Sequence, residues 1–152
     1  PYYKDIAEQL VLGATRRIKA AGAEYELVNV PGALEIPTAI RLAGAAEFHG
    51  FVALGCIIRG ETTHYDTVCN DSSRGLTLLS LQGVCLGNGI LTVETMEQAI
   101  VRADPEDQNK GGGAAAAALH LLALARRWGA PKGGVGFRPL DTIQLAKGGD
   151  TV

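Results

Sequence analysis

The sequence lacks the features that mark several large classes of protein. Its 152 residues carry 14 Lys and Arg against 16 Asp and Glu, a formal net charge of −2, and form no basic stripe of the kind that binds nucleic acid. No apolar run is long enough to span a membrane. The first residues, PYYKDIAEQL, have neither the basic nor the apolar region of a signal peptide, so we expect a cytoplasmic protein.

Cysteine and histidine are also scarce. The three cysteines, Cys56, Cys69 and Cys85, are odd in number and have no CxxC spacing, which indicates reduced thiols rather than a disulfide framework. The three histidines are not spaced as a pair of metal ligands. We therefore expect no structural zinc site.

The residues that are present suit one α/β domain. Hydrophobic residues make up 47% of the chain, enough for a core. Apolar runs predict strands at 25–30, 50–58 and 84–93, with one more possible at 141–146, and periodic patterns predict helices at 6–18, 38–46, 64–80, 96–103 and 111–128. This alternation predicts a parallel sheet with right-handed crossovers. We expect a domain at 1–128 and a Gly- and Pro-rich extension at 129–152.

The first candidate site is PGALEIP, residues 31–37, which follows the strand predicted at 25–30. Ligands of open parallel sheets bind beyond the carboxyl ends of the strands, so this position is informative. A turn leading into a helix would explain the motif equally well, with Pro31 and Gly32 as punctuation. Glu35 could stabilise the helix dipole or accept hydrogen bonds from substrate hydroxyls.

The second candidate site is RGETTHYD, residues 59–66, which ends the apolar run at 50–58. Gly60 allows a close approach of backbone to ligand, and Thr62 and Thr63 can cap the next helix. The free N–H groups at that helix start would suit a phosphate. His64 could exchange a proton there at neutral pH, although a capped helix with a surface histidine is the ordinary alternative.

The third candidate site is GNGILTVETMEQAIVRAD, residues 87–104, which runs from the strand predicted at 84–93 through the next helix. Asn88 stands between two glycines, and Arg102 closes the short helix predicted at 96–103. Arg102 could pair with a phosphate or lie at a solvated helix end. Lys110, in the NKGGG block, could be a second phosphate contact or a surface charge.

Four blocks, taken together and in order, resemble a known family. VPGALEIP, LGCIIRGETTHYD, NGILTVET with the following EQA and RAD, and NKGG before an alanine-rich helix are similar to the lumazine synthases, the penultimate enzymes of riboflavin biosynthesis. The resemblance implies a flavodoxin-like three-layer sandwich with a central, mainly parallel four-stranded sheet. It also implies condensation of 5-amino-6-ribitylaminouracil with 3,4-dihydroxy-2-butanone 4-phosphate to give 6,7-dimethyl-8-ribityllumazine, phosphate and water, without cofactor or metal.

The resemblance also implies roles for single residues. The pyrimidine and its ribityl chain would be held by Tyr2, which stacks on the ring, and by Ala33, Leu34, Glu35, Cys56, Ile57, Ile58 and Asn88. The phosphate would be held by Glu61, Thr62, Arg102 and Lys110. His64 would be the catalytic residue that transfers protons.

The family also implies an assembly. Its members are homopentamers, some of which build shells of sixty subunits, and riboflavin synthase is a further expected partner. The active site lies between neighbours, so Asn88 and Arg102 would come from the chain next to the one that supplies His64.

Two features depart from the family pattern. Many relatives have an aromatic residue where Asn88 stands. The family's first strand, which lies inside the sheet, is missing before the first helix, and this would leave its neighbours about 9.6 Å apart. Either residues that precede Pro1 or the run at 141–146 would have to fill that gap.

Two alternatives to the enzyme remain. A flavin- or lumazine-binding or shell-forming relative with little or no turnover would have the same fold, and the two departures favour it slightly. Retention of His64, Arg102 and Lys110 favours the enzyme, since a container needs none of them. An unrelated flavodoxin-like binder would not carry the four blocks in this order.

Overall fold

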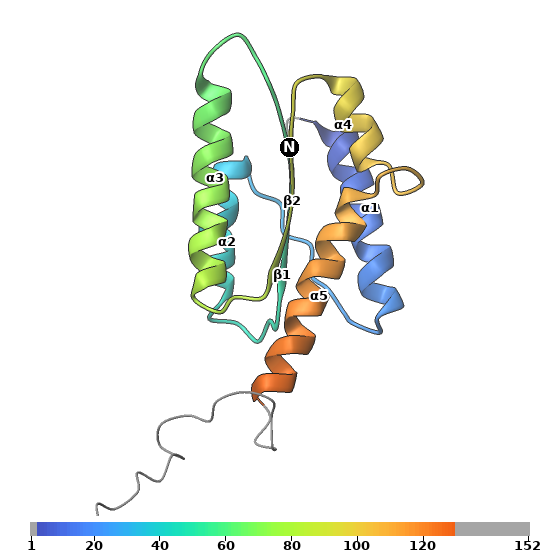
Figure 1. The fold of residues 1–152 in the computed structure, drawn as a ribbon, viewed down its shortest axis with the longest axis vertical. Helices are drawn as coiled ribbons and strands as arrows, with labels where there is room; N and C mark the ends of the chain where they lie inside the picture. The colour runs from blue at the N-terminus through green and yellow to red at the C-terminus, as the bar shows by residue number, and fades with distance from the viewer. Residues whose placement is uncertain (1–2, 130–152) are drawn as a thin grey trace, which may run out of the picture.

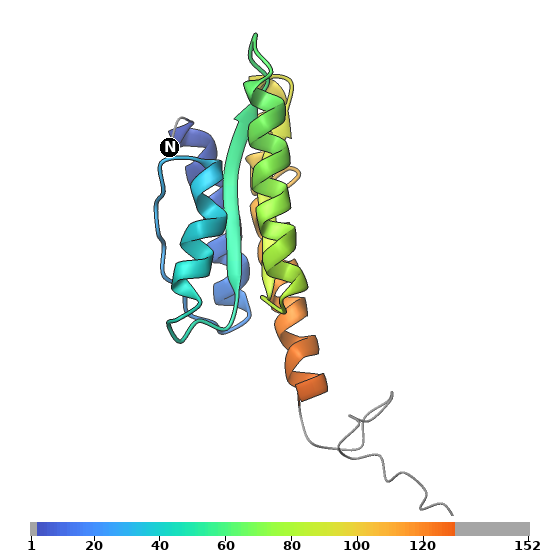
Figure 2. The same cartoon turned by 90° about the vertical axis from the view of Figure 1, so that its left-hand side faces the viewer.

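Two parallel strands separate two layers of helices in the computed structural model, which describes residues 3–129 (Figure 1). One face of the strands is covered by α2 (Ile36–Ala43) and α3 (His64–Leu81). The opposite face is covered by α1 (Lys4–Ala20), α4 (Met96–Ala103) and α5 (Lys110–Gly129), as the turned view in Figure 2 also shows. The expected α/β class with a parallel sheet is confirmed.

The sheet is formed by β1 (Phe51–Ile58) and β2 (Leu86–Val93), paired residue by residue. Phe51 lies opposite Leu86 at one end, and Ile58 lies opposite Val93 at the other. The ladder continues for one more bond, because the Arg59 N–H donates to the Val93 carbonyl at 2.9 Å. Since α3 carries the chain back between the two strands, both strands end at the same edge of the molecule.

The core consists of two apolar clusters, one on each face of the strands. Leu91 and Val93 of β2 pack with Ile6 and Leu10 of α1 on one face. The second cluster contains Ile36, Ile40, Ala53, Leu76, Leu79 and Leu86. Burying a side chain of this size stabilises the fold by about 1.5–3 kcal/mol, so both layers are held mainly by apolar contact.

The predicted helices are present with small shifts. In α1 the expected stripe is buried at Ile6, Leu10 and Ala14, and the turn that follows has a φ of 71° at Gly22, a value that favours glycine. The helix expected at 38–46 begins earlier, at Ile36, after the 3₁₀ turn η1 (Ala33–Glu35). Helices α3, α4 and α5 begin and end within one residue of expectation. No helix in the described region is long and apolar enough to cross a bilayer.

The expectation of a four-stranded sheet is not confirmed, because residues 3–129 form two strands. Residues 25–30, expected as a strand, belong to no ladder, and Tyr25, Leu27 and Val28 are exposed. The physical reason is the lack of a partner: β1 pairs with β2 along one edge, and no described strand lies along its other edge. The possible strand at 141–146 lies outside the described residues, as does most of the extension expected at 129–152.

Two glycines let α5 approach its neighbours backbone to backbone. A Cβ atom on Gly87 of β2 would overlap the carbonyl of Ala114 in α5. A Cβ atom on Gly111 of α5 would overlap the carbonyl of Leu10 in α1. The buried side chains that α5 presents are correspondingly small, namely Ala114, Ala115 and Ala118. The position of α5, and of Lys110 at its start, therefore depends on these contacts.

Gly87→Ala should lower the free energy of unfolding by about 1–3 kcal/mol, because the added methyl group must push α5 away from β2. Gly113→Ala is the matched control, since a Cβ atom there meets nothing within 4 Å and alanine favours a helix. Chemical denaturation at one fixed protein concentration measures both variants. Equal midpoints for the two variants would show that the close approach at Gly87 is unimportant.

Candidate active site

The predicted residues of the β1 end and of the loop that follows it lie at the edge where β1 and β2 end, at the top of Figure 1. Residues 59–63 connect β1 to α3, and residues 94–95 connect β2 to α4. The η1 turn packs against both β1 and α3. Three of the expected groups therefore lie around one corner of the fold, namely residues 33–35, 56–58 and 61–64.

His64 is the first residue of α3, and it is exposed. Its backbone N–H donates to the Thr62 hydroxyl over 3.4 Å, a long hydrogen bond. Thr63 stands at the cap position but makes no capping hydrogen bond with its side chain. The expected cap is thus supplied weakly, by Thr62 alone. The Asp66 N–H donates to the Thr63 carbonyl at 3.0 Å, so the amide groups with capacity for a ligand are those before Asp66.

The residues expected to meet the pyrimidine form the end of β1. Ile57 is buried, and Cys56 and Ile58 are half-buried. Burial raises the pKa of the Cys56 thiol to about 11, so it is a neutral thiol and a poor nucleophile near pH 7. Among the η1 residues, Leu34 and Glu35 are exposed and Ala33 is half-buried. Tyr2 lies outside the described residues.

Asn88, Arg102 and Lys110 line one cavity of about 350 Å³ on the other side of β2, together with Thr92, Gly113 and Ala117. The half-buried Arg102 guanidinium donates to the Gln98 carbonyl at 3.1 Å through Nη1. Within residues 3–129 neither Arg102 nor Lys110 has a carboxylate within ion-pair distance. Two cations at one hollow, without acidic partners among the described residues, are chemically suited to bind an anion.

A larger hollow of about 490 Å³ lies between α1 and α4, but its chemistry differs. Its polar lining is acidic, with Asp5, Glu8 and Asp104. Carboxylates repel phosphate, so this hollow is the poorer candidate for a phosphorylated substrate despite its larger volume. Charge identifies the smaller cavity as the candidate for a phosphorylated substrate.

The two groups of predicted residues do not meet within the chain. The cavity that holds Arg102 and Lys110 is lined by β2, α4 and α5, and neither His64 nor Glu61 is among its lining residues. Asn88 belongs to this second group, and its side-chain oxygen accepts a hydrogen bond from the Ile90 N–H at 3.0 Å. The described chain therefore carries two separate parts of a site.

One polar cluster at the strand ends was not predicted. Arg59 Nε donates to Glu94 Oε2 at 2.8 Å, and Arg59 Nη2 lies 3.5 Å from Asp66 Oδ1. A signal was present in the sequence, because Arg59 and Glu94 are the next residues after the paired ends Ile58 and Val93. Opposite charges at the same step of two parallel strands favour an ion pair once the register is known.

Comparison with known proteins agrees with this geometry. The sequence model described as 6,7-dimethyl-8-ribityllumazine synthase matches residues 1–126. The chain belongs to this family. The resemblance found in the four sequence blocks is therefore confirmed for most of the chain.

Individual members of the lumazine synthase family are similar over most of their length. A protein of that name from Jannaschia sp. (strain CCS1) is 56% identical over 149 residues, which cover 97% of this chain and 84% of the relative. The protein from Novosphingobium aromaticivorans is 54% identical over 128 residues, 84% of this chain and 92% of the relative. The protein from Methylorubrum extorquens (strain PA1) is 57% identical over 133 residues, which cover 82% of this chain and 76% of the relative.

Cys56 should react with iodoacetamide far more slowly in the folded protein than in the unfolded chain. Its raised pKa leaves about 0.1% thiolate at pH 8, and the rate should climb as the pH approaches 11. Peptide mapping after timed alkylation measures the rate at each cysteine, with denatured protein as the control. Equal rates for Cys56 in the two states would contradict the burial of its thiol.

Proposed function

We propose that this protein condenses 5-amino-6-ribitylaminouracil with 3,4-dihydroxy-2-butanone 4-phosphate to form 6,7-dimethyl-8-ribityllumazine, phosphate and water. Membership of the lumazine synthase family supports this reaction. The observation that carries the proposal is the cavity where Arg102 and Lys110 lie without acidic partners among the described residues. A dianionic phosphate is the ligand that such a pair suits best.

The phosphate is held from two sides in this proposal. Arg102 and Lys110 supply positive charge, and Thr62 with the free amide groups at the start of α3 supplies hydrogen-bond donors. Glu61, next to Thr62 in the same loop, lies at the phosphate site by its similarity to the family. Fixing the phosphate holds the reactive carbonyl near the amine of the pyrimidine, and such orientation can contribute about 7–11 kcal/mol to the rate.

His64 transfers the protons that the condensation requires. Imine formation, elimination of phosphate and ring closure each move a proton, and an exposed imidazole can accept and return it. The contribution expected of one general acid–base group is about 10²–10⁴-fold. No cofactor or metal takes part in the proposed reaction.

The pyrimidine lies between β1 and η1 in this proposal. Backbone groups of Cys56, Ile57 and Ile58 bind the ring, and the 33–35 turn, ending in Glu35, binds the ribityl hydroxyls. The exposure of Leu34 and Glu35 supports this role, since an incoming ligand can reach them. Tyr2 stacks on the ring, and Asn88 contributes a polar wall in place of an aromatic one.

The functional form is an oligomer in which neighbours complete the site. The separation of His64 from the cavity of Arg102 supports this, because one described chain carries the two parts apart. We propose a pentamer, or a shell of sixty subunits built from pentamers, in the cytoplasm, with riboflavin synthase as a further partner. The catalytic domain is 1–128, with 129–152 as an extension, and its full sheet has four strands.

Arg102→Ala should raise the Michaelis constant for the butanone phosphate by roughly 10- to 100-fold, the loss expected for a charge-assisted hydrogen bond. Fluorescence of the lumazine product measures turnover with both substrates. Arg126→Ala, which removes an exposed cation from the last turn of α5, is the matched control and should behave as wild type. An unchanged Michaelis constant contradicts the role of Arg102, and absence of product from the wild type contradicts the reaction.

Co-expression of His64→Ala with Arg102→Ala chains should restore activity if neighbours share the site. His64→Ala alone should retain measurable turnover, lowered by about 10²–10⁴-fold. In random mixed oligomers about a quarter of the sites between neighbours then hold both wild-type residues. Assays below the Michaelis constant should approach a quarter of wild-type activity. Activity equal to the mean of the two single variants would show that each site lies within one chain.

A further inference from the structure

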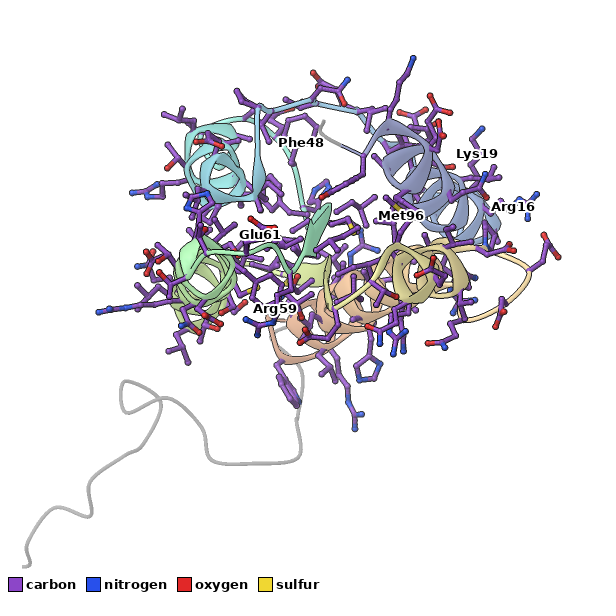
Figure 3. All side chains as sticks on the ribbon, turned by 90° about the horizontal axis from the view of Figure 1, so that it is seen from above. Arg16, Lys19, Phe48, Arg59, Glu61 and Met96 are labelled. Atoms are coloured by element: carbon purple, nitrogen blue, oxygen red, sulfur yellow. The ribbon has the colours of Figure 1, made fainter. Side chains whose placement is uncertain are left out.

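Arg59 contacts the elements at both ends of the loop that carries Glu61 and Thr62, namely the end of the strand pair and the first turn of α3. Its backbone N–H is fixed to the end of β2 through the 2.9 Å bond to the Val93 carbonyl. Its side chain reaches the first turn of α3, where the guanidinium carbon lies 4.2 Å from the centre of the Tyr65 ring. Figure 3, seen from above the strand ends, shows Arg59 between α3 and the helices of the opposite layer, with Glu61 nearby.

Two carboxylates complete the contacts of this guanidinium. Glu94 accepts from Nε at 2.8 Å, and Asp66 lies 3.5 Å from Nη2. Hydrogen bonding to Glu94 raises the pKa of Arg59 further above its ordinary value, so the charge is permanent. Burial raises the pKa of Tyr65, so its ring meets the cation as a neutral phenol.

Glu94 is itself held in place by the start of α4. The Thr95 hydroxyl accepts from the Gln98 N–H at 3.3 Å, and the Gln98 side chain accepts from the Glu94 N–H at 2.9 Å. The Gln98 side chain thus bonds the residue before the cap and fixes the backbone of Glu94 to the first turn of α4. Arg59 links Glu94, in the loop that leads into α4, to the first turn of α3.

Thr63 is held at the start of α3, because its carbonyl accepts from the Asp66 N–H at 3.0 Å, but little else among the described residues holds residues 60–62. A Cβ atom on Gly60 would meet nothing within 4 Å, and the Thr63 side chain makes no capping bond. The long 3.4 Å bond from the His64 N–H to Thr62 is local to the loop. The path of the backbone that presents Thr62 and His64 therefore depends mainly on its two ends.

From these contacts we infer that Arg59 is a positioning residue, which sets the loop of Thr62 and the imidazole of His64 by clamping α3 to Glu94. This inference rests on the proposed function and adds a residue to it. Arg59 differs from Arg102 in its surroundings: two carboxylates face its single positive charge, so the cluster has no surplus charge to attract phosphate. It acts through the loop and not on the substrate.

Arg59→Gln and Glu94→Gln test this role, because a positioning residue should affect kcat more than the Michaelis constant. Steady-state kinetics measure the two constants separately. Each variant should lower kcat by about tenfold or more, because a small misplacement of reacting groups is costly, and should leave the Michaelis constant of the pyrimidine within about twofold. The double variant should be no worse than the worse single one, since both remove the same link. Arg59→Lys should recover part of kcat by keeping one ion pair.

Hydrogen exchange supplies a readout that does not need activity. The peptide spanning 60–67 should exchange several-fold faster in Arg59→Gln than in the wild type, while the peptides of β1 and β2 remain unchanged. Arg16→Gln is the matched control, because it removes a different exposed ion pair, with Glu106, far along the sequence from this loop. If residues 60–67 exchange faster in Arg59→Gln but the wild type forms no lumazine, the positioning role of Arg59 is supported and the proposed function is rejected.

Three results would overturn the role of Arg59. A large rise in the Michaelis constant of the butanone phosphate with unchanged kcat would make Arg59 a phosphate ligand. A loss of activity matched by an equal loss of folded protein would make it merely structural. Wild-type kcat together with wild-type exchange of residues 60–67 would show that the loop does not depend on it.

Discussion

The parallel register of β1 against β2 is the constraint on which the rest of this structure depends. It brings Ile58 opposite Val93, so both strands end at one edge and both following loops begin there. The same register sets Arg59 beside Glu94 and places Gly87 where α5 crosses β2. A slip of one residue would move these positions and turn each side chain to the opposite face, where the other helix layer lies.

Charge environment separates two arginines that both belong to the family blocks of the sequence. Arg59 is surrounded by Glu94 and Asp66, and its charge is satisfied within the protein. Arg102 donates one hydrogen bond to a backbone carbonyl, and within the described residues no carboxylate lies near it. A cation with no internal partner attracts an external anion, whereas a neutralised cation can only hold its neighbours in place.

Much of the fold could be predicted because its signals are local. The apolar stripe of α1 and the unbroken apolar runs of β1 and β2 gave those elements to within about two residues. The strand expected at 25–30 failed for a non-local reason: a β-rich run becomes a strand only beside a partner, and no described strand lies next to it. The early start of α2 also differs from the prediction, because Pro37 lies in its first turn, where proline is tolerated.

A site residue could be predicted where its own side-chain chemistry suggests the role. It could not be predicted where the role depends on a contact with a residue distant in the sequence. Arg102 and Lys110 were chosen as phosphate contacts from their charge and family blocks, and the structure brings them to one cavity. The link between Arg59 and Glu94 joins residues 35 positions apart, and it becomes visible only when the strands are paired. The hydrogen bond from Ile90 to Asn88 likewise depends on the course of β2 and not on residue type.

Exposed ion pairs are usually dismissed because they add only about 0.2–1 kcal/mol to a folding free energy of about 5–15 kcal/mol. The free energy of folding is not the relevant reference for the loop at 60–63. The relevant equilibrium is between the observed conformation of this short loop and other conformations of it, with the rest of the protein still folded. A difference of 1.4 kcal/mol changes the ratio of two such states by about tenfold. Contacts from one guanidinium to Glu94, Asp66 and Tyr65 are therefore large in the equilibrium that concerns His64, even though they are small in the stability of the whole domain.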